Sequence, residues 1–142
     1  NMFVSELKIK NGPSSAITSL FSNGFNVILA GTEEQGVFVI INGIGASTNN
    51  SADLSDNFIY DFCAVNNKRI LAASDEGIND ISISNDKILV IKCTTRQGLP
   101  DNIVSALKHI PGTHLYWAGT QEGGVVMYDA DAKKWYLPVL KI

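Results

Sequence analysis

Three glutamates recur at matching places in the chain and are the first candidates for chemistry. Glu34, Glu76 and Glu122 each stand two residues after a threonine or serine that ends a β-rich run. Carboxylates gathered at one rim of a fold could bind a cation or the hydroxyl groups of a sugar. A polar hairpin turn that recurs by descent is the simpler interpretation of the same pattern.

Polar residues between the repeats form a second group of candidates. Asn57 precedes one β-rich run, and a cluster of Arg, Gln, Asp and Asn precedes the next. Asn57 and Asn102 also fit a local role, because Asn side chains hydrogen-bond backbone groups in turns. The candidate ligand-binding residues are therefore Glu34, Glu76, Arg96, Gln97, Asp101, Asn102 and Glu122.

The two histidines raise the question of a metal. His109 and His114 flank the turn 110–113 and could meet across a hairpin, and His is a common metal ligand. No cysteine or third ligand stands nearby at zinc-type spacing, so exposed hairpin residues are the simpler interpretation. The sequence predicts no metal site and no cofactor. No acid–base or nucleophile pair recurs at matching places, so we expect no enzymatic activity.

A repeat must position these side chains, and a small-residue triplet marks it. Residues 30–32, 72–74 and 118–120 read Ala-Gly-Thr, Ala-Ala-Ser and Ala-Gly-Thr. The middle residues are 42 and then 46 residues apart, close to the ~40–50 residues of a four-stranded propeller blade. Strands near the centre of a wedge-shaped blade are crowded, which favours a residue with little or no side chain at this place.

Each copy divides into four runs of residues that favour β-structure, separated by turn residues. No window favours a helix. In the first copy the predicted strands are Ile17–Ser22, Asn26–Thr32, Val37–Asn42 and a weak fourth within Gly45–Asp53. In the second they are Ile59–Val65, Arg69–Ser74, Asn79–Ser84 and Lys87–Thr94. In the third they are Ile103–Ile110, His114–Gln121, Gly124–Tyr128 and Lys134–Leu140.

The predicted fold is all-β, with three four-stranded antiparallel repeats as β-propeller blades in one segment, residues 1–142. The repeats cover approximately residues 12–53, 54–97 and 98–142, and residues 1–11 hold an extra strand, Phe3–Lys10. Closed propellers have four to eight blades, so three blades leave the ring incomplete. The chain is either truncated from a longer propeller or closed by oligomerisation, for example as a homodimer that forms a six-bladed ring.

Composition excludes several classes of function. The formal net charge is -3 and the basic residues are scattered, which argues against nucleic-acid binding. No apolar run approaches the ~20 residues of a membrane span, so we expect no membrane insertion of this segment. Cys63 and Cys93 fall in the first and fourth predicted strands of one blade, too far apart for a disulfide. We predict two free thiols.

The third copy resembles the repeat of the two-component regulator propellers, the periplasmic sensor regions of bacterial hybrid histidine kinases. The resemblance rests on Gly98-Leu99-Pro100-Asp101-Asn102-Ile103-Val104, Tyr116-Trp117-Ala118-Gly119-Thr120, Gly123-Gly124-Val125 and Asp129. It implies a periplasmic or extracellular sensor that binds a small molecule or glycan, with carbohydrate as one such ligand.

Two functions are therefore carried forward. The first is a non-catalytic ligand-binding or sensor module that acts through the propeller loops. The second is a structural or protein-interaction element whose blade faces assemble with other subunits.

Overall fold

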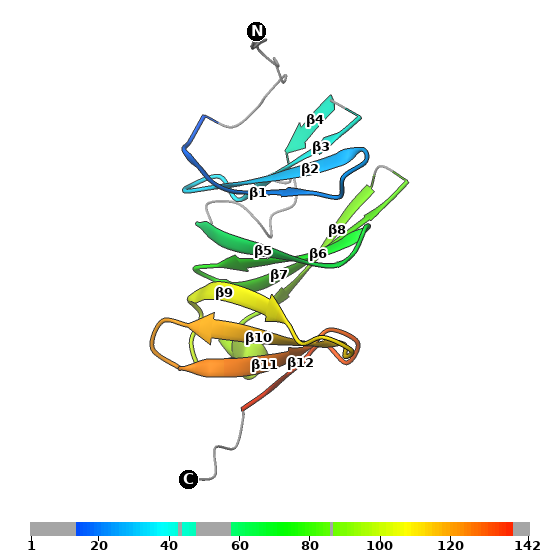
Figure 1. Cartoon of the computed structure of the whole chain (residues 1–142). Coiled ribbons are helices and arrows are strands. Elements are labelled where there is room, and N and C mark those ends of the chain that lie inside the picture. Colours follow the sequence, from blue (N-terminus) through cyan, green and yellow to red (C-terminus); the bar gives the residue numbers. More distant parts are fainter. Residues whose placement is uncertain (1–13, 43, 48–57, 86, 138–142) are drawn as a thin grey trace, which may run out of the picture.

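The computed structural model describes residues 14–42, 44–47, 58–85 and 87–137 (Figure 1). These residues form three antiparallel sheets of four strands, and each sheet follows the chain order. The all-β prediction with three four-stranded repeats is therefore confirmed.

The first sheet contains β1 (Ile17–Ser22), β2 (Val27–Thr32), β3 (Val37–Ile41) and β4 (Ile44–Ser47). The second contains β5 (Ile59–Asn66), β6 (Arg69–Ser74), β7 (Gly77–Ser84) and β8 (Lys87–Cys93). The third contains β9 (Val104–His109), β10 (Leu115–Thr120), β11 (Val125–Asp129) and β12 (Lys134–Tyr136).

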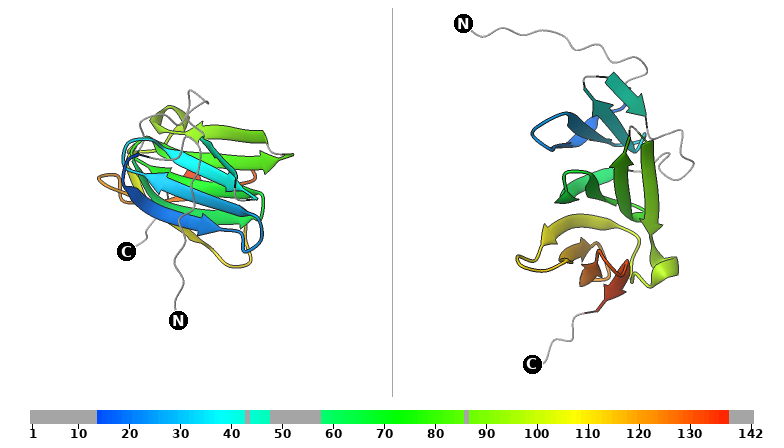
Figure 2. Two further views of the ribbon diagram at one scale, coloured as in Figure 1. Left: turned by 90° about the horizontal axis from the view of Figure 1, so that it is seen from above. Right: turned by 90° about the vertical axis from the view of Figure 1, so that its right-hand side faces the viewer.

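The three sheets stack face to face in sequence order, with the first at the top of Figure 1 and the third at the bottom. In Figure 2 the first strands of the sheets, β1, β5 and β9, lie along one side of the stack. The described residues place no further sheet above the first or below the third. The predicted strand Phe3–Lys10 lies outside the described residues.

Every predicted strand of the three repeats is present, and most of the strand boundaries lie within one residue of the prediction. β7 begins at Gly77, two residues earlier than predicted, because Gly77 pairs with Ser74 across a turn and takes a φ of 92°, which a glycine adopts without strain. β12 covers Lys134–Tyr136, and residues 138–140 of its predicted range lie outside the described residues. A 3-10 helix, η2 (Thr95–Gln97), forms where no helix was predicted. β4 covers Ile44–Ser47, and the remainder of its predicted range lies outside the described residues.

Two hydrophobic clusters hold the sheets together. Between the first and second sheets the cluster is aliphatic: Val27, Leu29, Val37, Val39, Ile59, Ile70, Ala72, Ile81 and Ile83. Between the second and third it includes two tyrosines: Leu71, Ala73, Ile78, Cys93, Leu99, Val104, Leu107, Tyr116, Ala118, Val126, Tyr128 and Ala130. Burial of such side chains, at about 25 cal/mol per Å² of apolar surface, is the main source of stability.

The small-residue position lies where two sheets approach most closely. A Cβ on Gly31 would stand 2.6 Å from Cγ2 of Ile59 in the next sheet and 2.4 Å from the hydroxyl of Ser19. The predicted crowding is therefore confirmed at Gly31. Ala73, at the matching place in the second sheet, is fully buried.

A charged cluster crosses the junction of the second and third sheets. The Arg69 guanidinium donates to both carboxylate oxygens of Asp80, at 2.8 and 2.5 Å, and to the carbonyl of Ala130. Tyr128 donates its hydroxyl to Asp80 at 3.2 Å, and the Cys93 thiol lies 3.4 Å from that hydroxyl. Cys63 and Cys93 are both free, as predicted.

Candidate ligand-binding site

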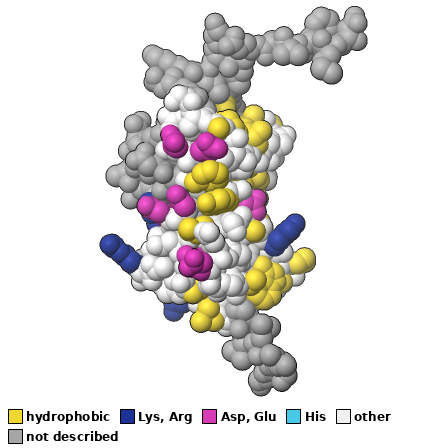
Figure 3. Space-filling view, turned by 90° about the vertical axis from the view of Figure 1, so that its left-hand side faces the viewer, with side chains coloured by type: hydrophobic (Ala, Val, Ile, Leu, Met, Phe, Trp, Pro, Cys, Tyr) yellow, Lys and Arg dark blue, Asp and Glu magenta, His cyan; other side chains and the backbone are white. Residues whose placement is uncertain are grey.

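The turns that carry the three recurring glutamates lie on one edge of the stack, at the left of Figure 1. The connection from β8 to β9 reaches the same edge, which we call the loop rim. Figure 3 looks onto this edge and shows acidic side chains at several levels, beside a broken band of hydrophobic side chains. The turns that carry Glu34, Glu76 and Glu122 and the β8–β9 connection therefore share one rim of the fold.

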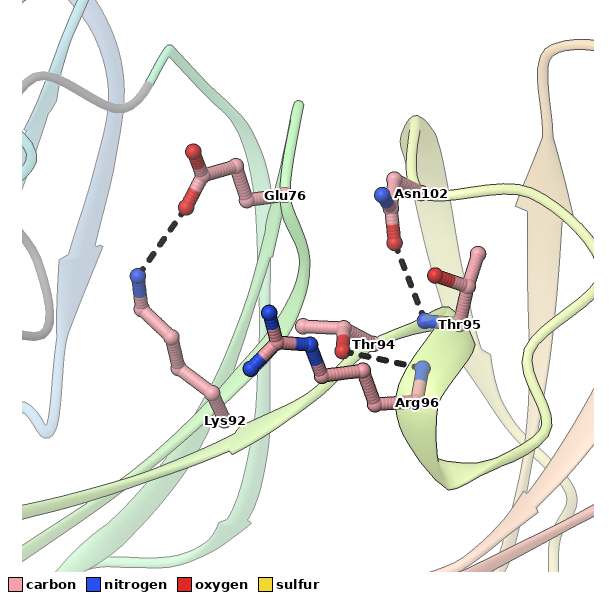
Figure 4. Close-up of a pocket in the computed structure, with 6 residues that line it drawn as sticks. All are labelled: Glu76, Lys92, Thr94, Thr95, Arg96 and Asn102. Carbon is pink, nitrogen blue, oxygen red and sulfur yellow. Dashed lines mark hydrogen bonds and ion pairs between the residues drawn. The ribbon is translucent and has the colours of Figure 1, made fainter.

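A hollow of about 390 Å³ opens at the loop rim beside the β8–β9 connection. It is lined by Glu76 from the β6–β7 turn, Lys92 from β8, Thr94, Thr95 and Arg96 around η2, and Asn102 before β9 (Figure 4). Every lining side chain is polar or charged. The hollow therefore suits a polar ligand better than an apolar one.

Backbone contacts fix the floor of this hollow. The Asn102 side-chain oxygen accepts from the backbone N–H of Thr95 at 3.0 Å, and the Thr94 hydroxyl accepts from the N–H of Arg96 at 3.2 Å (Figure 4). The N–H of Gly77 donates to the carbonyl of Asn102, which ties the β6–β7 turn to the connection. A side chain at Gly77 would collide with the carbonyl of Cys93, 2.1 Å from a Cβ built there. These contacts hold η2 beside the β6–β7 turn.

Two of the three charged side chains in the hollow form an ion pair with each other, and the third, Arg96, stands apart from that pair. Lys92 Nζ lies 3.1 Å from a carboxylate oxygen of Glu76, and this pair occupies one side of the hollow in Figure 4. The Arg96 guanidinium projects between that pair and the side formed by Asn102 and Thr95 (Figure 4). The hydrogen bond of Arg96 uses its backbone N–H, and among the described residues no ion pair engages its guanidinium. One cation is therefore open to an incoming anion.

The structure brings together three of the seven predicted site residues, namely Glu76, Arg96 and Asn102. It adds Lys92, Thr94 and Thr95, which sequence reasoning missed. Lys92 pairs with Asn79 across β7 and β8, so strand registration at the end of the second sheet could have pointed to it. No comparable signal pointed to the two threonines, because η2 was not predicted.

The Asp101 side chain, predicted as a ligand-binding group, has a structural role. Its carboxylate accepts from the backbone N–H of Glu122 at 2.7 Å and from that of Ile103 at 3.2 Å. These bonds lower the pKa of Asp101, the contact with Glu122 most of all. Asp101 therefore joins the β8–β9 connection to the β10–β11 turn.

The other predicted residues do not line the hollow. The Glu122 side chain is exposed at the β10–β11 turn, and Glu34 is exposed at the β2–β3 turn of the first sheet. Gln97 ends η2, and Asn57 lies outside the described residues. Glu34, Glu76 and Glu122 belong to turns of three different sheets, and of the three Glu76 lines the hollow.

The histidines have separate partners. His109 Nε2 lies 2.7 Å from the carbonyl of Thr113, while His114 Nε2 lies 3.4 Å from a carboxylate oxygen of Asp129. Asp129 also accepts from the backbone N–H groups of Ala132 and Asp131, and these contacts lower its pKa. Among the described residues no group of three potential ligands could hold a metal ion.

Comparison with known proteins places the fold but not the activity. No family model and no curated protein matches this sequence. Among solved structures, the computationally designed Ika4 protein aligns with 95% of this chain and 79% of its own, at 16% identity and a TM-score of 0.62. The extracellular domain of a protein described as a hybrid two-component system of B. thetaiotaomicron aligns with 88% of this chain, at 19% identity and a TM-score of 0.51.

The chain spans 22% of that extracellular domain. A second B. thetaiotaomicron extracellular domain, described as belonging to a one-component system, aligns at 16% identity over 91% of this chain and 23% of its own, with a TM-score of 0.38. The designed protein and the first extracellular domain, with TM-scores above 0.5, share the arrangement of their sheets with this chain. Within the described part of the chain, no helix is long and apolar enough to cross a membrane.

Proposed function

We propose that this chain is a non-catalytic ligand-binding module of a sensor and that its sheets are blades of a β-propeller. The observation that carries the proposal is the open Arg96 guanidinium in the hollow at the loop rim. The hydroxyl of Thr95 and the amide of Asn102 stand beside it (Figure 4). The single carboxylate of the hollow, Glu76, is paired with Lys92, which favours binding over acid–base catalysis.

The ligand that best fits these groups is a saccharide with an acidic group. An Arg guanidinium binds a carboxylate or sulfate through two parallel hydrogen bonds, and hydroxyl and amide groups bind sugar hydroxyls. The rigid backbone around η2 supports such binding, because the site needs little reorganisation when the ligand enters.

Calorimetric titration with oligosaccharides tests this proposal. Uronate-containing oligosaccharides should bind saturably, and neutral ones of equal length should bind at least tenfold more weakly. Arg96→Ala should weaken binding by roughly ten- to a hundredfold, the loss expected for a hydrogen bond to a charged group. Glu76→Gln should strengthen binding, because it frees Lys92 from its carboxylate partner.

Glu34→Ala is the matched control, because Glu34 occupies the corresponding turn of the first sheet and does not line the hollow. It should leave the affinity unchanged. Absence of binding by every saccharide, or equal affinities for wild type and Arg96→Ala, would contradict the proposal.

We also propose a periplasmic or extracellular location. The support is the similar fold of an extracellular domain from B. thetaiotaomicron. Fractionation of the native host, with antibodies against this chain, should recover it outside the cytoplasm. Recovery in the cytoplasmic fraction would contradict this location.

The alternative function is assembly with other subunits through the faces of the sheets. The specific observation in its favour is the exposure of large apolar side chains on both outer sheets, including Leu20, Trp117 and Val125. This assembly does not compete with a ligand at the loop rim, because it uses different surfaces.

A further inference from the structure

The two ends of the stack expose apolar side chains whose counterparts at the internal junctions are packed between sheets. We call the outward surface of the first sheet the upper face. Ile17, Leu20 and Ile28 are exposed on it, whereas Ala30, Phe38 and Ile40, on the same side of the sheet, are buried within this chain. We call the outward surface of the third sheet the lower face, with Trp117, Gly119, Val125, Met127 and Tyr136. Strand registration places the lower-face residues on one side of the sheet, because Trp117, Met127 and Tyr136 are paired partners and Gly119 pairs with Val125.

Most residues that match the upper face are buried in the other two sheets, and Phe62, the counterpart of Leu20 in the second sheet, is partly buried. Ile17 pairs with Thr32 just as Ile59 pairs with Ser74 and Val104 with Thr120. Ile59 and Val104 are fully buried against the preceding sheet, whereas Ile17 is 48% exposed. Leu20 is 70% exposed, whereas its counterpart Leu107 is 4% exposed.

Residues that match the lower face are also buried in the other two sheets. Trp117 pairs with Met127 just as Leu29 pairs with Val39 and Leu71 with Asp80. Leu29 and Leu71 are fully buried, and Trp117 is 38% exposed. Val125 is 55% exposed, whereas its counterparts Val37 and Ile78 are fully buried.

The contrast is sharpest at the small-residue position. Gly31 is pressed against Ile59 of the next sheet, but a Cβ on Gly119 would meet only the Cβ of Ala106, at 3.7 Å. The space over Gly119, where the isoleucine of a next sheet would lie, is therefore unoccupied in the single chain. The upper face carries the exposed isoleucine that fits it, Ile17.

We propose that a second copy of this chain packs its upper face onto the lower face, with Ile17 of one copy over Gly119 of the other. The contact repeats the packing of Ile59 over Gly31. Ser105 stands where Thr18 stands in the first sheet, and Thr18 donates its hydroxyl to the carbonyl of Ile59. In the single chain the Ser105 hydroxyl donates to the carbonyl of Gly119 at 3.4 Å. In the dimer it would turn to donate to the carbonyl of Ile17 in the second copy.

A two-fold axis makes this contact twice and completes a ring. Two copies supply six sheets, within the four to eight of known closed propellers, whereas three copies would supply nine. The upper face of each copy meets the lower face of the other, so both contacts of the dimer are the same. Head-to-tail association of two copies therefore closes the ring without a second kind of interface. Exposed apolar patches of this kind are typical of protein interaction sites.

Light scattering during size-exclusion chromatography tests the proposal on the 142-residue chain. The expected mass is twice 15.3 kDa. Gly119→Val should give a monomer with an unchanged circular dichroism spectrum, because the position has room in the single chain and valine favours strands. Ile17→Asp should also give a monomer, and it decides the question if the valine variant fails to fold.

Leu89→Lys is the matched control. Leu89 is a 61% exposed residue of the middle sheet, away from both outer faces, and its replacement should leave the dimer intact. A monomeric wild type, a mass above two copies, or a dimer that survives both Gly119→Val and Ile17→Asp would overturn the proposal.

Disulfide trapping tests the predicted contact itself. A mixture of Ile17→Cys and Gly119→Cys chains should form a covalent dimer on mild oxidation, because a bridge requires Cβ atoms ~3.8 Å apart. Each variant by itself, and the wild type with its native thiols, should stay uncrosslinked under the same conditions. Failure of the mixture to crosslink more than these controls would contradict the contact.

Discussion

The two internal junctions of the stack are built from different chemistry in the same geometry. Between the first and second sheets the packed side chains form an aliphatic cluster. Between the second and third sheets, Arg69, Asp80 and Tyr128 add charge and hydrogen bonds to the packing. Val39 and Asp80 occupy matching places in their sheets. The same structural position therefore holds an apolar valine side chain in the first sheet and a carboxylate in the second.

The difference concerns specificity more than strength. Aliphatic packing is non-directional and tolerates small shifts, whereas a buried ion pair gains little net free energy after desolvation. Arg69 reaches both Asp80 of its own sheet and the carbonyl of Ala130 in the third. We infer that the charged cluster fixes how the third sheet is placed on the second, and that the aliphatic junction supplies stability.

The largest effect is expected from breaking the charged cluster on one side. Asp80→Val should lower the free energy of unfolding by about 3–5 kcal/mol, because it leaves the Arg69 cation and the Tyr128 hydroxyl without their partner. The double variant Arg69→Leu with Asp80→Val should recover most of that loss, because both charges are gone. Urea unfolding measures both values, and a double variant as unstable as the single one would contradict the inference about specificity.

The next effect comes from adding one methyl group at the matching glycines. Gly31→Ala should cost about 1–3 kcal/mol, because its Cβ overpacks against Ile59. Gly119→Ala should be neutral or slightly stabilising, since the site is open and glycine weakens a strand. Thermal unfolding of both variants at one low protein concentration measures the difference, and equal losses would show that the two positions are not distinguished by packing.

A smaller effect is expected at alkaline pH, at the charged junction. Burial raises the pKa of Tyr128, with Cys93 and Asp80 adding to it, and burial likewise raises the pKa of Cys93. A pKa that is higher in the folded state gives stability that is complete below the unfolded pKa, about 8.5 for Cys and 10 for Tyr, and is lost as the pH rises. The free energy of unfolding should therefore fall as the pH rises above about 8.5, and more steeply above about 10.

Substitution of the buried tyrosine identifies the source of this pH dependence. Tyr128→Phe should flatten the alkaline fall in stability, and Tyr60→Phe, at a partly exposed tyrosine of β5, should not. Urea midpoints between about pH 8 and 11 provide the measurement. An unchanged slope in Tyr128→Phe would show that the charged junction does not govern the alkaline response.

The smallest losses of stability are expected for two side chains that hydrogen-bond to backbone groups of the neighbouring sheet. Asp61 accepts from the N–H of Leu107 at 3.1 Å, and Thr18 donates to the carbonyl of Ile59. Asp61→Ala and Thr18→Val should each cost about 1 kcal/mol. Hydrogen exchange should show the N–H of Leu107 less protected in Asp61→Ala only, and loss of protection in both variants would mean that the two junctions open together.

Much of the fold could be predicted because its signals are local. The matching triplets at residues 30–32, 72–74 and 118–120 gave the repeat, and β1 and β6 begin and end where predicted. η2 was missed because three residues carry no helical periodicity. Gly77 extended β7 because its left-handed φ allows pairing to resume directly after a tight turn.

Less of the candidate site could be predicted, because it joins residues from several elements. Glu76, Arg96 and Asn102 were chosen as loop residues, and they do share a hollow. Lys92 lies inside a strand and reaches Glu76 only through the register of β8 on β7. Asp101 was chosen as a possible ligand group, but the structure engages its carboxylate with two backbone N–H groups.

The sequence by itself determined three four-stranded sheets, because strand propensity, turn residues and repeat spacing all act over short stretches of chain. It also determined the pair of free thiols, since a strand separation can be estimated from order in the sheet. Only the tertiary structure decided that Arg96 stands open beside a paired Glu76 and Lys92. Only the tertiary structure decided that Ile17 and Gly119 are exposed while their counterparts are packed, because burial depends on which surfaces meet when the sheets stack.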